Sequence, residues 1–515
     1  MHAVEMKQIT LTFPAVKAND HVDFDLDYGE VHALVGENGA GKTTLMRILN
    51  GFFKPDGGEI WIAGQKVNYA VSEAQKLGVA MVHQNFMQIP SLSIVENVIL
   101  GMIPTDKAGL VNYTFAREQV QRLMDSMGMG HVDLNTKVQR LSVGERQKIE
   151  IIKLLYLGAK ILIFDEPTAV LTPQEAKELF RIIEKLKSEG KGIIYISHKL
   201  NEIVEISDRA TVMRHGKVVA SFNEKSKLDT KMIASAMVGM PDFSMITNKH
   251  MSVASDDTVL DVQNLWYYDI KSKIVKIRNL SMKIQRGEIL GIGGVEGNGQ
   301  QELTHLLVGL LHQNNGTIIL DGKDISNTST FVRREAGIGY ISEDRMTHGV
   351  SLQSSIPENM ICGKESDSAY SRNGILNKKM ITQAADSLIQ NYDVRGGTLD
   401  APVKSLSGGN MQKVILGREI ERNPKLLIAV HPTRGLDIGA INFVREQLIR
   451  QKESGAAVLL ITADLDELVG LSDRILVMYE GQFSGEIKDV EHVTEERLGL
   501  LMGSAKVKEE TACKE

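Results

Sequence analysis

The feature of this 515-residue sequence that most constrains its fold is an internal repeat. Three segments of the first half recur in the same order in the second half: residues 31–45 match 289–303, 141–148 match 406–413, and 161–172 match 426–437. A repeat of this length indicates two copies of one folding unit. The sequence therefore predicts one domain at 1–240 and a second at 259–503. A polar linker at 241–258 joins them, and a charged tail follows at 504–515.

Each half alternates short apolar runs with helical patterns, which is typical of an α/β fold with a parallel sheet wrapped by helices. In the first half, residues 31–35, 161–164 and 192–196 are predicted strands, and residues 42–50 are a predicted helix. The region 89–160 is richer in helical pattern. We expect it to form a smaller helical subdomain.

The composition narrows the functional classes. The 59 Lys and Arg residues are outnumbered by 65 Asp and Glu, so the net charge of −6 disfavours nonspecific binding to nucleic acid. No apolar run reaches the roughly 18 residues that a membrane helix needs, and no signal peptide is recognisable at the start. We therefore expect a membrane role to depend on a partner protein.

A glycine-rich loop in the first half fits the pattern G-x-x-x-x-G-K-[ST], between a predicted strand and a predicted helix. Its glycines allow backbone N–H groups to face a phosphate, while Lys42 reaches the β- and γ-phosphates and the Thr43 hydroxyl ligates Mg²⁺. The residues expected to bind nucleotide here are Gly36, Glu37, Asn38, Gly39, Ala40, Gly41, Lys42, Thr43 and Thr44.

The predicted strand at 161–164 ends in Asp165 and Glu166, at the sheet edge that also carries the phosphate loop. We expect Asp165 to ligate Mg²⁺ and Glu166 to accept a proton from the attacking water. Gln84 and His198 each follow another strand. We expect Gln84 to contact both the metal and the water, and His198 to bond the γ-phosphate.

The second half lacks these chemical groups. The matched pairs are Lys42 with Gln300, Thr43 with Gln301, Gln84 with Glu343, Asp165 with Val430, Glu166 with His431, and His198 with Ala463. The sequence therefore predicts that the second half does not hydrolyse a nucleotide. It leaves open whether nucleotide still binds there through backbone N–H groups.

The LSxGx segments show the opposite pattern. The second half has the glycine-rich version, whose residues expected to approach a γ-phosphate are Ser407, Gly408, Gly409 and Asn410. The first half instead has Glu145 at the end of this segment, an acidic neighbour that disfavours a phosphate. Downstream, the second half has Asp437 where the first half has Thr172.

This order of phosphate loop, Gln84, LSxGx segment, Asp165-Glu166 and His198 resembles the ATP-binding-cassette (ABC) ATPases over nearly the whole chain. The resemblance implies two nucleotide-binding domains, each with a RecA-like core and a small helical subdomain, paired head to tail. ATP would then lie, with Mg²⁺, between the phosphate loop of the first half and the LSGGN signature of the second, within one chain. The resemblance also suggests that Phe13 stacks on adenine.

The unequal tandem layout is similar to the ATPase subunits of bacterial simple-sugar and nucleoside importers. Phrases such as YISEDR and HPTRGLDIGA are most similar to the nucleoside branch. This resemblance implies two membrane-spanning permease subunits, an extracellular substrate-binding lipoprotein, and a location at the cytoplasmic face of the membrane.

Three alternatives remain. The first is a sugar importer ATPase. The second is a soluble ABC protein acting on ribosomes or nucleic acid, although such proteins usually keep both sites and carry a long charged linker. The third is a purely structural module, which the complete first site disfavours.

Overall fold

The computed structural model describes residues 2–14, 16–37, 39–67, 71–82, 87–168, 171–197, 199–239, 245–248, 257–270, 272–295, 297–365, 367–396 and 398–503. The chain divides into two compact units, Met1–Ser244 and Met245–Glu515. The tail at 504–515 lies outside the described residues.

The elements of the first unit are β1 (His2–Phe13), β2 (Val16–Asp27), β3 (Val31–Gly36), α1 (Lys42–Leu49), β4 (Gly57–Ile62), β5 (Gln65–Lys66), α2 (Val71–Lys76), β6 (Val79–Val82), α3 (Ile94–Ile99), α4 (Tyr113–Ser126), η1 (Val138–Arg140), α5 (Val143–Tyr156), β7 (Ile161–Asp165), α6 (Pro173–Ser188), β8 (Gly192–Ile196), α7 (Leu200–Ile206), β9 (Arg209–Arg214), β10 (Lys217–Phe222), η2 (Lys225–Lys227) and α8 (Thr230–Val238).

The elements of the second unit are β11 (Thr258–Asp269), β12 (Ile274–Gln285), β13 (Ile289–Gly293), α9 (Gln300–Val308), β14 (Asn315–Leu320), β15 (Lys323–Asp324), α10 (Thr330–Glu335), β16 (Ile338–Ile341), η3 (Arg345–Gly349), α11 (Ile356–Ile361), β17 (Ser371–Arg372), β18 (Ile375–Leu376), α12 (Lys378–Asn391), η4 (Val403–Ser405), α13 (Gly408–Ile420), β19 (Leu426–Val430), α14 (Ile438–Glu453), β20 (Ala457–Ile461), α15 (Leu465–Leu471), β21 (Arg474–Tyr479), β22 (Gln482–Ile487) and α16 (Glu495–Gly503).

The two units repeat the same sheet topology. The larger sheet has the order β6-β7-β8-β3-β9-β10 in the first unit and β16-β19-β20-β13-β21-β22 in the second. In both, the neighbours are parallel except for the last strand, which pairs antiparallel with its neighbour. A four-stranded antiparallel sheet accompanies each, β2-β1-β4-β5 and β12-β11-β14-β15. The predicted α/β tandem fold is therefore confirmed.

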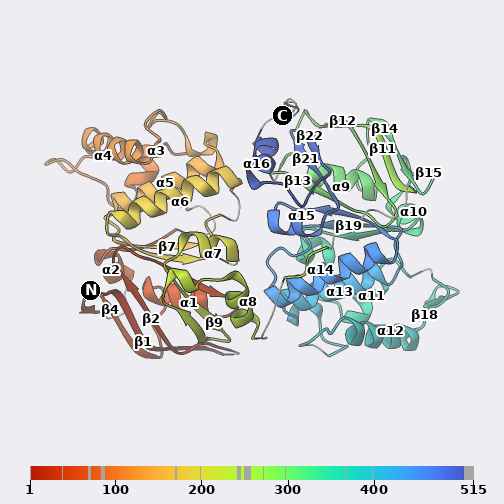
Figure 1. Ribbon diagram of the computed structural model, residues 1–515, viewed down its shortest axis with the longest axis horizontal. Helices are drawn as coiled ribbons and strands as arrows, with labels where there is room; N and C mark the ends of the chain where they lie inside the picture. Colours follow the sequence, from red (N-terminus) through yellow and green to blue (C-terminus); the bar gives the residue numbers. More distant parts are fainter. Residues whose placement is uncertain are drawn as a thin grey trace, which may run out of the picture. The chain divides into compact units, whose positions relative to one another are not determined.

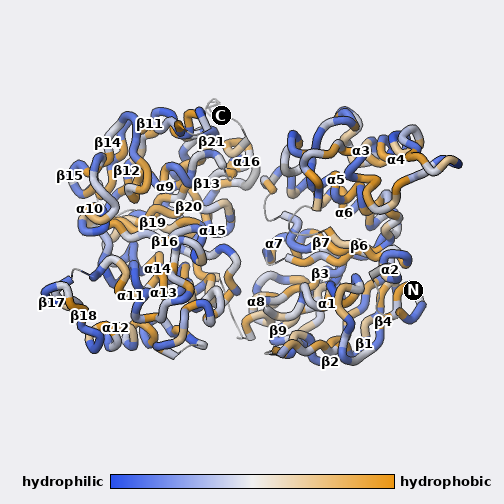
Figure 2. Tube along the Cα trace, turned by 180° about the vertical axis from the view of Figure 1, so that it is seen from behind, coloured by the Kyte–Doolittle hydropathy of each residue, from blue (hydrophilic) through white to orange (hydrophobic). Residues whose placement is uncertain are grey.

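The predicted elements of the first half form where the apolar pattern places them. β3, β7 and β8 cover the three predicted strands, and every residue of β3 and β8 is buried. Such fully buried runs are expected for central strands covered on both faces. Figure 2 shows hydrophobic stretches following the strands and the inward faces of the helices in each unit.

Each unit has two regions on opposite sides of its central strands. Figure 1 shows α3 and α4 beyond one side of β7, and β1, β2 and β4 beyond the other. The helical region shares one hydrophobic cluster with the sheet, since Val98, Val120 and Ile152 belong to the same core as Phe164. The second unit repeats this arrangement, with α12 and α13 on one side of β19 and β11 and β12 on the other.

A short piece of the segment expected to be a linker packs on the second unit. Asn248 is 6% exposed. Its side-chain amide donates to Leu471 O at 2.9 Å and to Asp473 Oδ1 at 3.0 Å. Its Oδ1 accepts from Lys452 Nζ at 3.2 Å. Residues 245–248 therefore belong structurally to the second unit, and β11 begins at Thr258.

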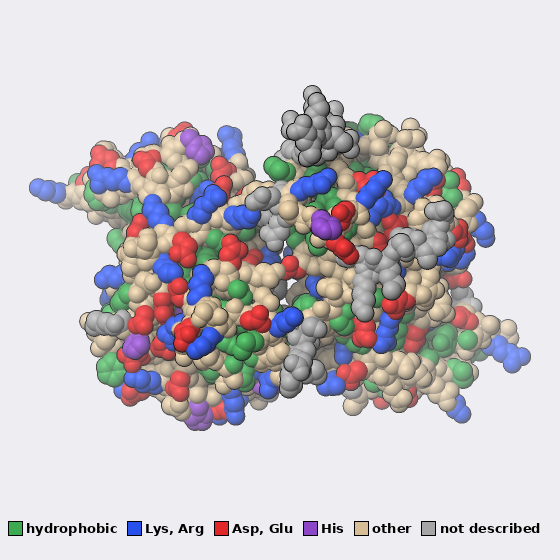
Figure 3. All heavy atoms as spheres, viewed as in Figure 1, with side chains coloured by type: hydrophobic (Ala, Val, Ile, Leu, Met, Phe, Trp, Pro, Cys, Tyr) green, Lys and Arg blue, Asp and Glu red, His purple; other side chains and the backbone are tan. Residues whose placement is uncertain are grey.

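Charged side chains of both signs intermix over the visible face of each unit (Figure 3). Among the helices in the described ranges, none combines the length and the hydrophobicity that crossing a bilayer would require.

Candidate functional site

The phosphate loop of the first unit connects β3 to α1 and depends on two glycines. Gly36 and Gly41 have φ of 157° and 99°. A Cβ atom at Gly36 would lie 2.3 Å from Met213 O, and one at Gly41 would lie 2.2 Å from Ala18 O. No larger residue fits these positions without a backbone shift, so the loop is built from glycine for both conformation and space.

Lys42 begins α1 and turns its ammonium back over the loop. Its Nζ donates to Gly36 O at 2.6 Å and to Glu37 O at 2.9 Å. The residue is 8% exposed, and burial lowers the pKa of Lys42, an effect that the charges of Glu166 and Asp165 partly oppose. A buried cation that donates to two carbonyl oxygens at the start of a helix is suited to binding an anion.

The rest of the loop follows the motif. Thr43 and Thr44 lie half-buried in the first turn of α1, and Ala40 is buried beneath the loop. Gly39 is exposed, and Asn38 lies outside the described residues. The Asn19 side chain donates to Gly41 O at 3.2 Å and so fixes the loop against β2. Asn19 was not among the residues that the motif predicts.

Asp165 is the last residue of β7 and Glu166 follows it directly; in the sheet, β8 lies between β7 and β3. Burial, with a smaller contribution from the Glu166 charge, raises the pKa of Asp165 to about 6. Glu166 has φ of 48°, and its N–H donates to Ile196 O at 2.9 Å. The two carboxylates therefore meet at the carboxyl edge of the sheet, and Lys42 interacts with both of them.

Gln84 and His198 lie outside the described residues. The strands that precede them, β6 and β8, end at Val82 and Ile196 on the same edge of the sheet as β7. Their roles stay predictions.

Phe13 ends β1 and packs on another aromatic ring. It is 36% exposed, and its ring meets that of Phe53 edge to face with centroids 5.7 Å apart. The Arg47 guanidinium of α1 lies over the Phe53 ring at 5.9 Å. The stacking role suggested for Phe13 would use the part of its ring that Phe53 leaves exposed.

The corresponding loop of the second unit keeps its shape without the charge. Gln300 Nε2 donates to Val295 O at 3.0 Å, much as Lys42 contacts the first loop. Glu302, in the first turn of α9, forms an ion pair with Lys276 of β12 at 3.4 Å. A carboxylate in this turn opposes phosphate binding at the helix start.

The signature of the second unit starts α13. Ser407 is the N-cap, and its hydroxyl accepts from Asn410 N at 3.4 Å and from Asn410 Nδ2 at 2.9 Å. The Gly409 position packs against the start of α14, where a Cβ atom would lie 3.1 Å from the Ala440 Cβ. Neither signature glycine has a side chain of its own, so the backbone at this helix start can approach a phosphate closely.

The first unit has carboxylates at the same place. Glu145 closes a capping box with Ser142, accepting from Ser142 N at 2.8 Å. Glu175, in the first turn of α6, accepts from Gly144 N at 3.2 Å. An amide of this signature is therefore already bonded to an acidic side chain of its own unit. Glu175 was missed from the sequence, although the T-x-x-E pattern with Thr172 is a capping-box signal that could have pointed to it.

Comparison with known proteins decides the family. Residues 19–169 and 277–434 match the family model described as ABC transporter. The chain belongs to the ABC transporter family. Both halves contain an ABC transporter domain, as the motifs predicted, and the protein is an ATPase whose activity is coupled to transport.

The relatives of this ABC protein align along almost its entire length. It is 45% identical to the guanosine import ATP-binding protein of Bacillus subtilis, covering 99% of this chain and 98% of the relative. It is 41% identical to a nucleoside import ATP-binding protein of Lactococcus lactis, covering 98% and 99%. A ribose import ATP-binding protein of Rubrobacter xylanophilus is 36% identical, with 96% and 97% covered.

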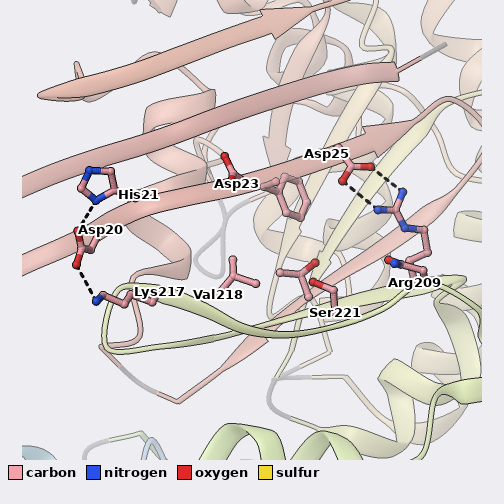
Figure 4. Close-up of a pocket in the computed structure, with 11 residues that line it drawn as sticks. Asp20, His21, Asp23, Asp25, Arg209, Lys217, Val218 and Ser221 are labelled. Atoms are coloured by element: carbon pink, nitrogen blue, oxygen red, sulfur yellow. Dashed lines mark hydrogen bonds and ion pairs between the residues drawn. The ribbon is translucent and has the colours of Figure 1, made fainter.

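A separate cavity in the first ABC domain, about 550 Å³ in volume, lies between β2 and the β9–β10 hairpin (Figure 4). Four of its charged side chains form two ion pairs. Arg209 donates to both carboxylate oxygens of Asp25, at 2.8 and 3.0 Å. Lys217 lies 3.2 Å from Asp20. Of the predicted nucleotide-binding residues that the structure describes, none lines this cavity.

Proposed function

We propose that this chain is the ATPase subunit that powers import of nucleosides. The assignment of nucleosides as the cargo is supported by two relatives. The guanosine import protein is 45% identical and the nucleoside import protein is 41% identical, both over nearly the full length. The observation that carries the mechanism is the contrast between the halves. The first has a buried Lys42 beside paired carboxylates, and the second has Gln300 and His431 at the matching positions.

In this proposal the residues of the first half perform the chemistry. Lys42 neutralises the β- and γ-phosphates of ATP, and Glu166 takes the proton of the attacking water. His198 bonds the γ-phosphate, and Phe13 stacks on adenine. The glycine-lined loop supplies backbone N–H groups, together with the positive end of the α1 dipole.

Mg²⁺ fits the residues present. Asp165 and Glu166 are neighbouring carboxylates, and burial together with the Glu166 charge raises the pKa of Asp165 to about 6, so a cation bound here would stabilise its charged form. We assign Thr43, Gln84 and Asp165 as the ligands, all of which offer the oxygen atoms that Mg²⁺ prefers. A bound Mg²⁺ would neutralise charge on the phosphate oxygens.

The second half supplies the signature. Ser407, Gly408, Gly409 and Asn410 would complete the site by approaching the γ-phosphate that the first half holds. The first half's own signature is unsuited to this task, because Glu145 and Glu175 already bond to its backbone. One hydrolytic site therefore forms in each chain, from the loops of one half and the signature of the other.

The proposal includes two membrane-spanning permease subunits, an extracellular substrate-binding lipoprotein, and a position at the cytoplasmic face of the membrane. The import names of the relatives support the permease partners. The helical subdomains carry exposed apolar side chains for such contacts, including Met102 and Leu110 in the first half. Closure on ATP would move the permease helices, and hydrolysis would reset them.

A simple-sugar importer is the second candidate, favoured by the 36% identity to a ribose import protein. Uptake assays separate the two. Cells lacking this gene, complemented with the wild type or with Lys42→Ala, are supplied with radiolabelled guanosine or with ribose. Guanosine uptake that requires Lys42 supports the proposal. Ribose uptake that requires Lys42, without guanosine uptake, contradicts it.

A further inference from the structure

Substitutions that remove the hydrolytic residues of the second half also create an ion pair. Glu343, which replaces the glutamine of the first half, accepts from Arg434 Nη1 at 2.9 Å. Arg434 lies in the loop after β19, and Glu343 lies in the segment after β16. The pair therefore links two segments that flank the inactive site. The Arg434 side chain is 52% exposed and the Glu343 side chain is 36% exposed, so this ion pair alone adds only modestly to the stability of the link.

Arg345 makes a second link between the same two segments. Its Nη2 donates to Gly435 O at 3.3 Å, next to Arg434 in the chain. Arg345 opens a single π-helical turn that Asp344 caps by accepting from Met346 N and Thr347 N, both at 3.0 Å. Such turns recur at functional sites. Here the turn directs a half-buried guanidinium toward the loop after β19.

Both linked segments lie next to the signature of the second half. On one side, a Cβ atom added at Gly408 would lie 3.5 Å from Arg345 Nη2. On the other side, a Cβ atom at Gly409 would lie 3.4 Å from Asp437 Oδ2, in the loop that begins with His431. The signature glycines therefore lie between the two segments that Arg345 and the Glu343–Arg434 pair hold together.

The π-helical turn is also fixed to the helix that the signature starts. Arg418 of α13 donates from Nη2 to Gly349 O at 2.9 Å, at the end of the turn. A Cβ atom at Gly349 would lie 2.7 Å from the Ile415 side chain of α13, so the contact is close. The turn, the loop after β19 and α13 form one connected unit.

The first half has no sequence for such links. At the positions of Glu343, Arg345 and Arg434 it has Gln84, Phe86 and Ala169. None of these three side chains carries a charge, so neither the ion pair nor the guanidinium contact has a counterpart there. The links are specific to the half that has lost its own hydrolytic residues and kept the LSGGN signature.

We propose that Glu343, Arg345 and Arg434 are positioning residues that hold the second-half signature in its working geometry for hydrolysis by the first half. The inference rests on the proposed function and assigns a role to residues that lie around the inactive site of the second half. Arg345 carries most of the effect, because it lies beside Gly408 of the signature and also donates to Gly435 O. ATP binding to the first-half loop does not depend on these links.

The test measures ATP hydrolysis by the full chain assembled with its membrane partners, and ATP binding by the full chain alone. Arg345→Ala should lower kcat by about 10-fold to 100-fold, the range expected when a reacting geometry is displaced. The Kd for ATP should stay within about 2-fold. Arg345→Lys, which keeps a charged donor for Gly435 O, should recover most of the loss.

A charge swap makes the test independent of Arg345. Glu343→Arg and Arg434→Glu should each lower kcat by about 2-fold to 5-fold, as for an exposed ion pair, and the double variant should restore it. Arg422→Ala is the matched control, since Arg422 also donates to a backbone carbonyl, Gly363 O at 2.7 Å, away from the signature. It should leave kcat unchanged.

Wild-type kcat in Arg345→Ala, or failure of the swap to restore either single variant, would overturn the inference while the proposed function stands. A wild-type complex that hydrolyses no ATP, or a Lys42→Ala complex that hydrolyses it normally, would instead refute the proposed function.

Discussion

Glu166 and His431 share one backbone conformation in the two halves of the protein. Their φ angles are 48° and 44°, and their N–H groups donate to the matching carbonyls Ile196 O at 2.9 Å and Ile461 O at 2.8 Å. Residues other than glycine adopt this left-handed conformation at a cost of roughly 1–2 kcal/mol. The second half has therefore kept the turn that presents the side chain, but the side chain at this position is an imidazole and not a carboxylate.

This relationship predicts that the turn alone does not confer activity. Glu166→Gln should lower ATP hydrolysis by the assembled complex by about 10²-fold or more, because the proton acceptor is lost while the turn remains. His431→Gln should leave the rate within about 2-fold. Steady-state phosphate release from the two variants checks this. Equal losses in both would show that the second half also contributes a base.

The lysine positions give a parallel prediction. Lys42→Ala should abolish hydrolysis, because the loop loses the buried cation that balances the phosphate charge. In the structure this cation is held over the loop by Gly36 O and Glu37 O. Gln300→Ala removes only a bond to Val295 O and should change the rate little. A similar collapse of hydrolysis in Gln300→Ala would contradict the assignment of the second half as inactive.

The sequence predicted the fold well because its strongest signals are local. The buried runs of β3, β7 and β8 and the phosphate loop each depend on neighbouring residues, and the repeat extended the same reasoning to the second half. The bond from Gly144 N to Glu175 and the contact of Arg345 with Gly435 join residues far apart in the chain. Neither follows from a motif, since each depends on how separate segments pack.

The packing of Asn248 could not be predicted from the sequence for a similar reason. A polar, aperiodic segment reads as a linker, but Asn248 finds partners in Lys452 and Asp473 that only the folded second unit brings together. The sequence indicated the polarity of the segment and had no means to indicate its burial.

The two signatures should respond differently to the same substitution. Ser407→Arg should block hydrolysis although every residue of the first-half loops is unchanged, because a bulky cation would replace the small N-cap of α13. Ser142→Arg, the matched change in the first half, should reduce hydrolysis far less. Phosphate release by the two complexes tests the head-to-tail assignment, and normal hydrolysis in Ser407→Arg is inconsistent with it.

A buried carboxyl in the second unit predicts a pH dependence of stability. Glu467 is 1% exposed, and burial, with the charge of Asp464, raises the pKa of Glu467 to about 7 from an ordinary value of 4.5. The folded state thus holds a proton that the unfolded state releases. The bound proton stabilises the folded state by on the order of 3 kcal/mol. This stabilisation is fully present below about pH 4.5 and is lost as the pH rises to about 7.

Glu467→Gln should remove this contribution, because an amide does not ionise. Urea unfolding of the full chain at pH 5 and pH 8 should show a smaller loss of stability in the variant than in the wild type. Glu446→Gln changes an exposed carboxylate of α14 and serves as the control, with the wild-type pH dependence. An unchanged pH dependence in Glu467→Gln would assign the effect to another group.

In the proposed mechanism, each chain has a single hydrolytic site. Trapping with orthovanadate retains ADP at sites that have hydrolysed ATP, so the ADP trapped per chain in the assembled complex counts those sites. A single site predicts one trapped ADP per chain, which Lys42→Ala should eliminate and Gln300→Ala should leave unchanged. Two ADP molecules per chain, or trapping that survives Lys42→Ala, would contradict it.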